Sequence, residues 1–141
     1  MRKTIYKEIF CEGPPESVWQ SLTNPEEISA WLMQTSDFRA EVGAKFTMQA
    51  KPMGKWDGVI YGEVLVAEKF SVLSYTWKGS QMKSTTILKW TLIPESDGTR
   101  LKMEHSGFSG LGDYVLGIFH AMGWNRFLKQ LNNLIRKNGK K

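Results

Sequence analysis

Histidine and cysteine are the side chains in this sequence best suited to acid, base or nucleophilic chemistry, and the chain has two of the first and one of the second. His105 ends the alternating run "TRLKMEH", where its parity predicts an inward-pointing ring at the end of a strand, near the mouth of a cavity. Such a histidine could serve as a general acid or base, hydrogen-bond a ligand, or close the strand as a satisfied residue. We favour a strand-ending residue that also contacts a ligand, with catalysis as an alternative.

Other reactive or metal-binding side chains are few. Cys11 falls in the first predicted strand with no histidine close in sequence, which favours a buried small apolar residue over a nucleophile. A lone cysteine excludes an internal disulfide and fits a reducing compartment. His120 falls on the predicted C-terminal helix, where we expect it partly exposed. Two histidines and one cysteine in no recognised spacing are too few to predict a metal site. The glycine-rich segment "GFSGLGDYVLG" matches no phosphate-binding loop, so we expect no cofactor.

Aromatic and methionine side chains give a stronger signal, since six Trp and seven Met are many for 141 residues. Apolar walls with a few polar tips suit a flat or hydrophobic ligand. The residues expected to line such a pocket are Trp31, Phe46, Met48, Tyr75, Trp77, Trp90, Met103, Phe108, Trp124 and Phe127. His105, together with Tyr75 or Tyr61, would then fix the orientation of the ligand. The alternative is plain packing, in which these rings fill the core completely.

Trp56 lies in the turn-rich segment "PMGKWDG", where periodicity gives no reason to bury it. We expect it either to fold over the cavity mouth as part of a lid or to mark a protein contact. Both alternatives stay open on the sequence alone.

The elements that must position these residues begin with a strand at residues 4–12 and two short helices. Two prolines suit the first turn of one helix, in "GPPESVWQSLTN", whose apolar residues share a face. Asn24 is then a predicted N-cap for a second helix, with Pro25 in its first turn and Glu27 three residues beyond the cap. The sequence therefore predicts two short helices in tandem.

A long β stretch follows, punctuated by turn residues. We expect strands at "DFRAE", "AKFTMQAK", "VIYGEVLVAEK", "FSVLSYTWK", "TTILKWTLI" and "TRLKMEH". Asp97 and Gly98 are a strong hairpin signal between the last two. Strands joined by consecutive hairpins form an antiparallel sheet, and its predicted inward face is large, aromatic and rich in methionine.

From Leu111 onward the apolar spacing becomes helical and continues to Ile135. Three glycines weaken the first half, so a break or a loop is possible there, and residues 124–137 form the safer helix. Asn138 and Gly139 are a natural stop. A single antiparallel sheet has one apolar face that needs a cover, and this helix is the long amphipathic element available for it. We therefore expect an α+β helix-grip fold, in which the sheet curves around the helix.

Length and composition predict one soluble globular domain, residues 1–141, with 41% hydrophobic and 23% charged residues. No apolar run reaches the ~18–20 residues of a membrane span, and the start lacks the apolar core of a signal peptide, so we expect a cytoplasmic protein without a membrane partner. The net charge is +5, and no acidic residue follows Asp113. We interpret the basic C-terminus as a helix end and a frayed tail rather than a nucleic-acid site.

Four segments, "PPESVWQSLTNPEEISAWL", "GEVLVAEKFSVLSYTW", "DGTRLKMEHSGF" and "GWNRFLKQLNNLI", resemble in order the START-like, or SRPBCC, superfamily, and within it proteins like the activator of heat-shock protein 90 ATPase. They cover essentially the whole chain, as in small bacterial members with a single domain. The resemblance implies the Bet v 1-like helix-grip fold, which commonly leaves a cavity between sheet and helix. It does not choose a function, because relatives include a co-chaperone domain, small-molecule binders, polyketide cyclases and resistance proteins.

We expect this protein to bind a hydrophobic or aromatic small molecule in that cavity, without chemistry of its own. One alternative is an enzyme of the cyclase or hydratase kind that uses His105 as acid or base. Another is a protein-interaction module of the co-chaperone type that stimulates a chaperone ATPase. Exposed sheet edges permit a monomer or a weak homodimer.

Overall fold

A six-stranded antiparallel sheet forms the centre of the fold in the computed structural model, which describes residues 2–139. Its strands are β1 (Arg2–Cys11), β2 (Lys45–Gln49), β3 (Val59–Glu68), β4 (Val72–Gly79), β5 (Thr86–Glu95) and β6 (Gly98–Ser109). The order across the sheet is β1-β6-β5-β4-β3-β2, so consecutive hairpins build it from β2 to β6, and β1 joins on the far side of β6. The predicted antiparallel sheet is confirmed.

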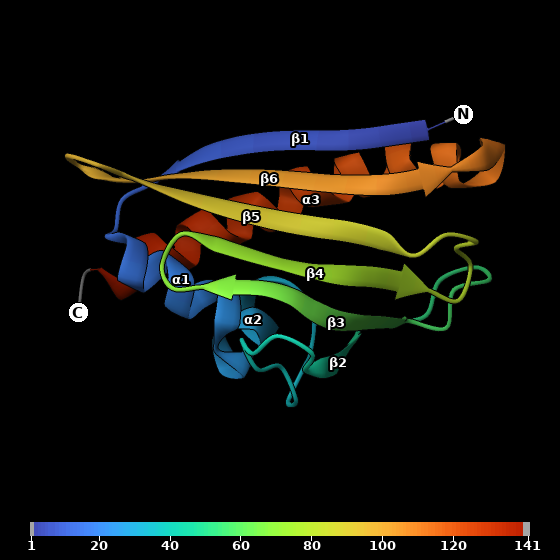
Figure 1. The fold of residues 1–141 in the computed structure, drawn as a ribbon, viewed down its shortest axis with the longest axis horizontal. Coiled ribbons are helices and arrows are strands. Elements are labelled where there is room, and N and C mark those ends of the chain that lie inside the picture. The colour runs from blue at the N-terminus through green and yellow to red at the C-terminus, as the bar shows by residue number, and fades with distance from the viewer. Residues whose placement is uncertain (1, 140–141) are drawn as a thin grey trace.

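The helices of the described chain are α1 (Pro15–Thr23), α2 (Pro25–Trp31) and α3 (Gly110–Asn138). α1 and α2 follow β1 at one end of the sheet, and the long α3 runs behind the sheet in Figure 1, against β1 and β6. The Asn24 side chain accepts a hydrogen bond from the Glu27 N–H at 3.1 Å and so caps α2, as predicted. None of the helices within residues 2–139 is long and apolar enough to cross a bilayer. The arrangement is the predicted α+β helix-grip fold.

The predicted strand at residues 37–41 is wrong, and this segment is irregular. The Asp37 carboxylate accepts hydrogen bonds from the Thr47 N–H at 3.1 and 3.3 Å, and the Thr35 hydroxyl donates to the Thr47 carbonyl at 2.8 Å. Short polar side chains that bind backbone groups compete with a strand ladder. Side chains therefore hold this segment against the edge strand β2, and five strands rather than six follow α2 in the described chain.

A β-bulge in β6 places His105 and Phe108 on the same face of the sheet. The partner of His105 in β1 is Ile5. The partner of Phe108 is Lys3, so β6 uses three residues where β1 uses two. Gly107, with a φ of +99°, takes the bulged conformation without steric cost. The prediction that His105 ends its strand is therefore wrong, because β6 continues through the bulge to Ser109, four residues beyond His105.

α3 is one continuous helix of 29 residues, so the break considered near its glycines does not occur. Gly117 permits a close approach to β1, because a Cβ at this position would lie 2.6 Å from the Lys3 Cδ. Gly110, with a φ of +81°, forms the corner between β6 and α3. The helix ends at Asn138, as predicted.

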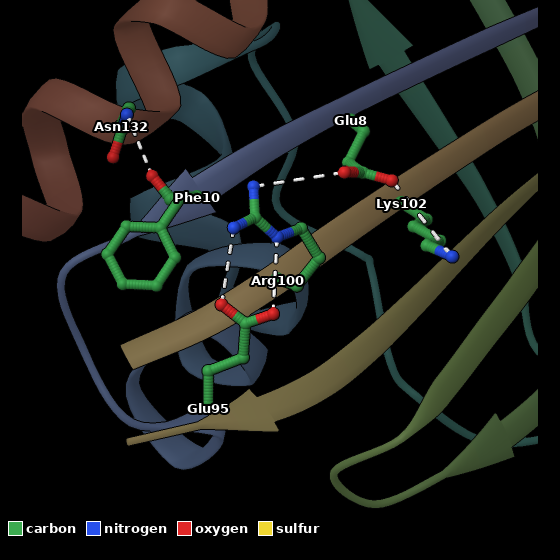
Figure 2. Close-up of polar contacts among 6 residues, drawn as sticks. All are labelled: Glu8, Phe10, Glu95, Arg100, Lys102 and Asn132. Carbon is green, nitrogen blue, oxygen red and sulfur yellow. Dashed lines mark hydrogen bonds and ion pairs between the residues drawn. The ribbon is translucent and has the colours of Figure 1, made fainter. Parts of the chain in front are cut away.

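The two halves of α3 are held unequally. The residues buried in the second half are Trp124, Leu128, Leu131 and Ile135, whereas those buried in the first half are Asp113 and Gly117. Figure 2 shows the Asn132 side chain donating a hydrogen bond to the Phe10 carbonyl of β1 at 3.2 Å. The second half of α3 (residues 124–138) therefore anchors the helix, and the first half (residues 110–123) rests on few apolar contacts.

Candidate functional site

The interior between the sheet and the helices contains most of the aromatic residues that the sequence singles out. Ten of the twelve predicted site residues are buried there: Trp31, Phe46, Met48, Tyr75, Trp77, Trp90, Met103, His105, Phe108 and Trp124. Phe127 is partly buried against the same core. These eleven residues therefore share one interior, and their contact with a ligand stays a prediction.

Tyr61 is the exception, because it lies on the outer face of the sheet with 54% of its surface exposed. Side chains alternate along a strand, and its neighbours Ile60 and Val64 face inward and are buried. Tyr61 therefore cannot contact a ligand held in the interior. Of the two tyrosines considered for orienting a ligand, Tyr75 is the one that faces inward.

His105 is fully buried rather than placed at a cavity mouth, and both of its ring nitrogens have partners. The Trp124 Nε1–H donates to His105 Nδ1 at 3.0 Å, and His105 Nε2 lies 2.8 Å from the Thr86 Oγ1. Since an indole N–H is only a donor, Nδ1 is the acceptor and Nε2 carries the proton. The Thr86 hydroxyl in turn donates to the Trp77 carbonyl at 2.6 Å. The predicted position at a mouth is wrong because α3 closes over this ring.

His120, on α3, takes the opposite tautomer and is partly exposed, as predicted. Its Nδ1 lies 2.8 Å from the Leu116 carbonyl, which only accepts, so Nδ1 carries the proton, and Nε2 accepts from the Trp77 Nε1–H at 3.3 Å. Burial holds the pKa of His105 well below its usual value, and the neighbouring His120 adds to this effect. Burial also lowers the pKa of His120, although the Leu116 carbonyl and Asp113 oppose it. Both rings are therefore neutral at pH 7.

Five aromatic rings pack together around these hydrogen bonds, and we call them the histidine cluster: Trp77, His105, Phe108, His120 and Trp124. Their neighbouring ring centroids lie between 4.7 and 6.3 Å apart. Trp90 extends the cluster, because its ring lies 5.7 Å from Trp124 and its Nε1–H donates to the Tyr75 hydroxyl at 3.1 Å. Burial raises the pKa of Tyr75, which keeps its hydroxyl neutral. The interior thus has aromatic walls with a few polar groups that bind one another.

Replacing Thr86 by Val is expected to lower the free energy of unfolding by about 1–3 kcal/mol, because Val keeps the shape but leaves the His105 Nε2–H without its partner and removes the hydroxyl that donates to the Trp77 carbonyl. Urea unfolding followed by circular dichroism measures this change. Thr91→Val is a matched control, since Thr91 lies on the opposite face of the same strand, and it should change stability little. Equal effects of the two substitutions would contradict the role given to the Thr86 hydroxyl.

Asp113 was not among the residues predicted from the sequence, yet it holds the start of α3 in place. It is buried, and its carboxylate accepts hydrogen bonds from the Lys83 N–H at 3.2 Å and the Ser84 N–H at 2.9 Å. Burial opposes ionisation of Asp113, but these N–H donors outweigh it, so the pKa of the carboxyl lies below its usual value. The carboxylate therefore ties α3 to the loop between β4 and β5. The feature of the sequence that could have indicated this role is that Asp113 is the single acidic residue in an apolar, glycine-rich segment.

Two hollows in the described surface lie away from the histidine cluster. One, of about 410 Å³ on the outer face of the sheet, is lined by Tyr6, Lys7, Glu8, Lys89, Thr91, Lys102, Met103 and Glu104. Beside it, Arg100 forms ion pairs with Glu95 and Glu8 (Figure 2). The other, of about 190 Å³ beside β2, is lined by Gln34, Thr35, Ser36, Thr47 and Gln49. The predicted site residues buried between the sheet and the helices expose at most 3% of their surface, so a ligand must displace part of the molecule to reach them.

Trp56 and Cys11 both stabilise the fold and are not placed for chemistry. The Trp56 Nε1–H donates to the Val59 carbonyl at 2.9 Å, and its partly buried ring lies beside Gly79, so it anchors its own loop to the end of β4. Cys11 is fully buried, and burial raises the pKa of its thiol to about 12, so it is not an activated nucleophile. Within residues 2–139, no group of three or more His, Cys, Asp or Glu side chains is placed to hold a metal ion.

Comparisons with known proteins agree with this fold. Residues 12–136 match the family described as Activator of Hsp90 ATPase homolog 1-like protein. Protein MLL2253 from Mesorhizobium loti is 33% identical, with 96% of this chain and 98% of that chain covered and a TM-score of 0.86. Protein CV1439 from Chromobacterium violaceum is 25% identical over 94% and 96% of the two chains, with a TM-score of 0.78. The Aha1 dimer from Colwellia psychrerythraea, at 19% identity over 94% and 96% and a TM-score of 0.77, is similar in fold alone. No curated protein matches this chain.

Proposed function

Because this chain belongs to the Activator of Hsp90 ATPase homolog 1-like family, we propose that it binds a hydrophobic or aromatic small molecule between the sheet and α3, without chemistry of its own. The helix-grip fold supports this proposal, since it places one large apolar interior under one long helix. Aromatic walls with a few fixed polar groups are the usual composition of a small-molecule site. The protein would act by sequestering its ligand from water.

One observation carries the proposal: the histidine cluster lies where the two halves of α3 meet, with His120 on the half that packs least and Trp124 on the half that anchors the helix. Within residues 110–123, the buried residues are Asp113 and Gly117, neither of which brings a large apolar side chain to the core. Three glycines inside this half, Gly112, Gly117 and Gly123, each cost about 1 kcal/mol of helix propensity relative to alanine. A segment with few buried apolar contacts opens at a lower free energy than the core. The first half of α3 is therefore the proposed route of ligand entry.

The hydrogen bonds of the cluster suggest which polar group would orient the ligand. At 3.3 Å, the bond from the Trp77 Nε1–H to His120 Nε2 is the longest of the cluster, and it joins the sheet to the segment that opens. When His120 moves away with α3, a carbonyl or hydroxyl oxygen of the ligand can accept from Trp77 instead. His105 keeps Thr86 as its partner on the sheet side. The aromatic walls then desolvate the rest of the ligand.

The geometry gives less support to an enzyme that uses His105. A general acid or base needs a ring nitrogen within hydrogen-bond reach of its substrate. Both nitrogens of His105 are bound to protein groups, and the ring is fully buried. His105 therefore has no free ring nitrogen that could transfer a proton in a cyclase or hydratase reaction.

The test is a thermal-shift and tryptophan-fluorescence titration with flat aromatic polyketides, flavonoids, fatty acids and sterols. We expect one class of ligand to raise Tm as its concentration increases. When the free ligand concentration is a hundred times Kd, binding should raise the free energy of unfolding by about 2.7 kcal/mol. Trp77→Phe should weaken binding because it removes the proposed donor. Trp19→Phe is the matched control, since Trp19 packs against Phe70 outside the cluster. The absence of binding by both readouts for every class would count against the proposal.

The description of the family favours a second candidate function, stimulation of a chaperone ATPase. In that case the protein would act through its surface, and its interior would be a packed core. Measuring the ATPase rate of a heat-shock protein 90 chaperone at saturating concentrations of this protein separates the two candidates. An unchanged rate would count heavily against the second, and a raised rate without any ligand binding would favour it over the first.

A further inference from the structure

The outer face of α3 exposes a row of large apolar side chains. The members of this apolar segment are Leu111, Val115, Ile118, Phe119 and Met122, and they expose between 43% and 68% of their surface. At 3.6 residues per turn they fall within about 100° of one another, opposite the buried Trp124 and Leu128. Single exposed apolar residues are normal on a protein, but a contiguous row on one helix face indicates a contact surface.

The same face becomes basic towards the C-terminus. The members of this basic segment are Arg126, Lys129, Arg136 and Lys137, all of them exposed. Arg136 forms an ion pair with Glu12, with 3.6 Å between its Nε and the Glu12 Oε2. The sequence has no acidic residue after Asp113, and Asp113 itself is buried against the loop between β4 and β5. An apolar segment is thus followed by a basic segment along one solvent-facing side of a helix about 43 Å long.

We propose that this face of α3 binds the surface of a bilayer that contains anionic lipids. The apolar segment enters the boundary between headgroups and acyl chains, and the basic segment lies on the lipid phosphates. The net charge of +5 attracts the whole molecule to such a surface. The buried side of α3, with Trp124 and Leu131, stays packed on the sheet during this contact.

The charge and shape of the face select a bilayer over other occupants. A nucleic acid would bind the basic segment but leave the apolar segment in water. A second copy of the chain would bring the same basic segment and the same net charge of +5 to the contact. The face belongs to a single helix, and the two hollows described above are lined by residues outside α3. A deformable lipid surface fits such a face without needing a preformed groove.

This binding is peripheral and independent of the proposed function. No helix within the described residues is long and apolar enough to cross a bilayer, so the protein lies on the surface and does not enter the core. The sequence-based expectation of no membrane partner rests on the missing span, and it does not bear on contact with a membrane surface.

Co-sedimentation of the protein with vesicles tests the proposal. We expect binding to mixed phosphatidylcholine and phosphatidylglycerol vesicles, little binding to phosphatidylcholine alone, and release by salt. The pair Phe119→Ser and Met122→Ser should lower the partition coefficient at least about tenfold, because it removes inserted apolar area. The pair Arg126→Glu and Lys129→Glu should lower it at least about thirtyfold.

Matched control pairs lie on other faces of the molecule. Tyr6→Ser with Tyr61→Ser removes exposed aromatic rings from the outer face of the sheet. Lys45→Glu with Lys51→Glu changes the net charge by the same amount as the Arg126 and Lys129 pair, at exposed positions on or near β2. Both control pairs should keep most of the vesicle binding, and thermal melts establish that every variant is folded.

Three results would overturn the proposal. One is no binding to the mixed vesicles. Another is an equal loss of binding in the control pairs, which would mean that only the overall charge or apolar area matters. The third is a dimer, measured by light scattering, that the Phe119 and Met122 pair dissociates while vesicles bind neither protein, which would assign the face to a second copy.

Discussion

Replacing Trp124 by Ala is expected to lower the free energy of unfolding by about 3–5 kcal/mol, the largest effect that we expect of a single substitution in this chain. Trp124 is 1% exposed, and its ring lies 5.4 Å from Trp77 and 5.7 Å from Trp90. The substitution leaves a cavity where the second half of α3 meets the sheet, and it removes the donor to His105 Nδ1. Urea unfolding at pH 7 measures the change.

Trp124→Phe separates the two contributions of this side chain. Phe keeps most of the apolar volume but has no N–H, so the loss should fall to about 1–3 kcal/mol, the cost of an unpaired buried acceptor plus a smaller ring. Phe119→Ala is the surface control on the same helix, and it should stay within about 0.5 kcal/mol of the native protein. A Trp124→Ala protein as stable as the native one would contradict the view that this ring anchors α3.

Lowering the pH from 7 towards 5 is expected to destabilise the protein steeply, because a neutral His105 is buried in its core and a neutral, partly buried His120 packs beside it. An unfolded chain protonates histidine near pH 6.5, whereas the pKa of His105 in the folded protein lies well below this value and that of His120 is also lowered. The unfolded state therefore binds more protons as the pH falls below about 6.5. Each histidine then lowers the free energy of unfolding by up to about 1.4 kcal/mol per pH unit, until the pH reaches the pKa of that histidine in the folded protein. The stability that depends on the neutral histidines is therefore fully present only above pH 6.5.

Two measurements check this pH dependence. Urea midpoints at a series of pH values should be constant above pH 7 and should fall below about 6.5. Proton NMR of the imidazole rings should show that neither His105 nor His120 titrates at the usual pH in the folded protein. Ring signals that titrate near pH 6.5 without unfolding would contradict the account. The depressed pKa of Asp113 adds a separate loss of stability at more acidic pH, where carboxylates protonate.

Local patterns were enough to predict most of the elements. The capping of α2 by Asn24 and the alternation of β4, β5 and β6 depend on neighbours in sequence, and these predictions are confirmed. The strand predicted at residues 37–41 failed because the Asp37 side chain binds the backbone of Thr47, ten residues away, in place of a ladder. The position of His105 failed because a bulge at Gly107 carries β6 beyond the point where the alternation stops.

The sequence was enough to predict which side chains face the interior, but not which of them form hydrogen bonds with one another. Parity placed the aromatic rings inward, and the same parity, through Leu88 and Trp90, would also have placed Thr86 inward. The bond from Trp124 to His105 joins a helix to a strand, so no local pattern encodes it. Whether large rings fill an interior or leave a space depends on how closely α3 approaches the sheet. That distance depends on Gly117 against Lys3, a contact between residues at opposite ends of the chain.

The burial of Cys11 makes this protein convenient for site-directed labelling. Cys11 is the only cysteine of the sequence, it is fully buried, and its thiol, with a pKa of about 12, is almost never the reactive thiolate at pH 7. A cysteine introduced by Phe119→Cys would therefore be the one thiol that reacts with a maleimide dye or a nitroxide, and the native sequence needs no other change. A probe at that position would sit on the first half of α3, where its mobility reports helix opening and its polarity reports contact with lipid.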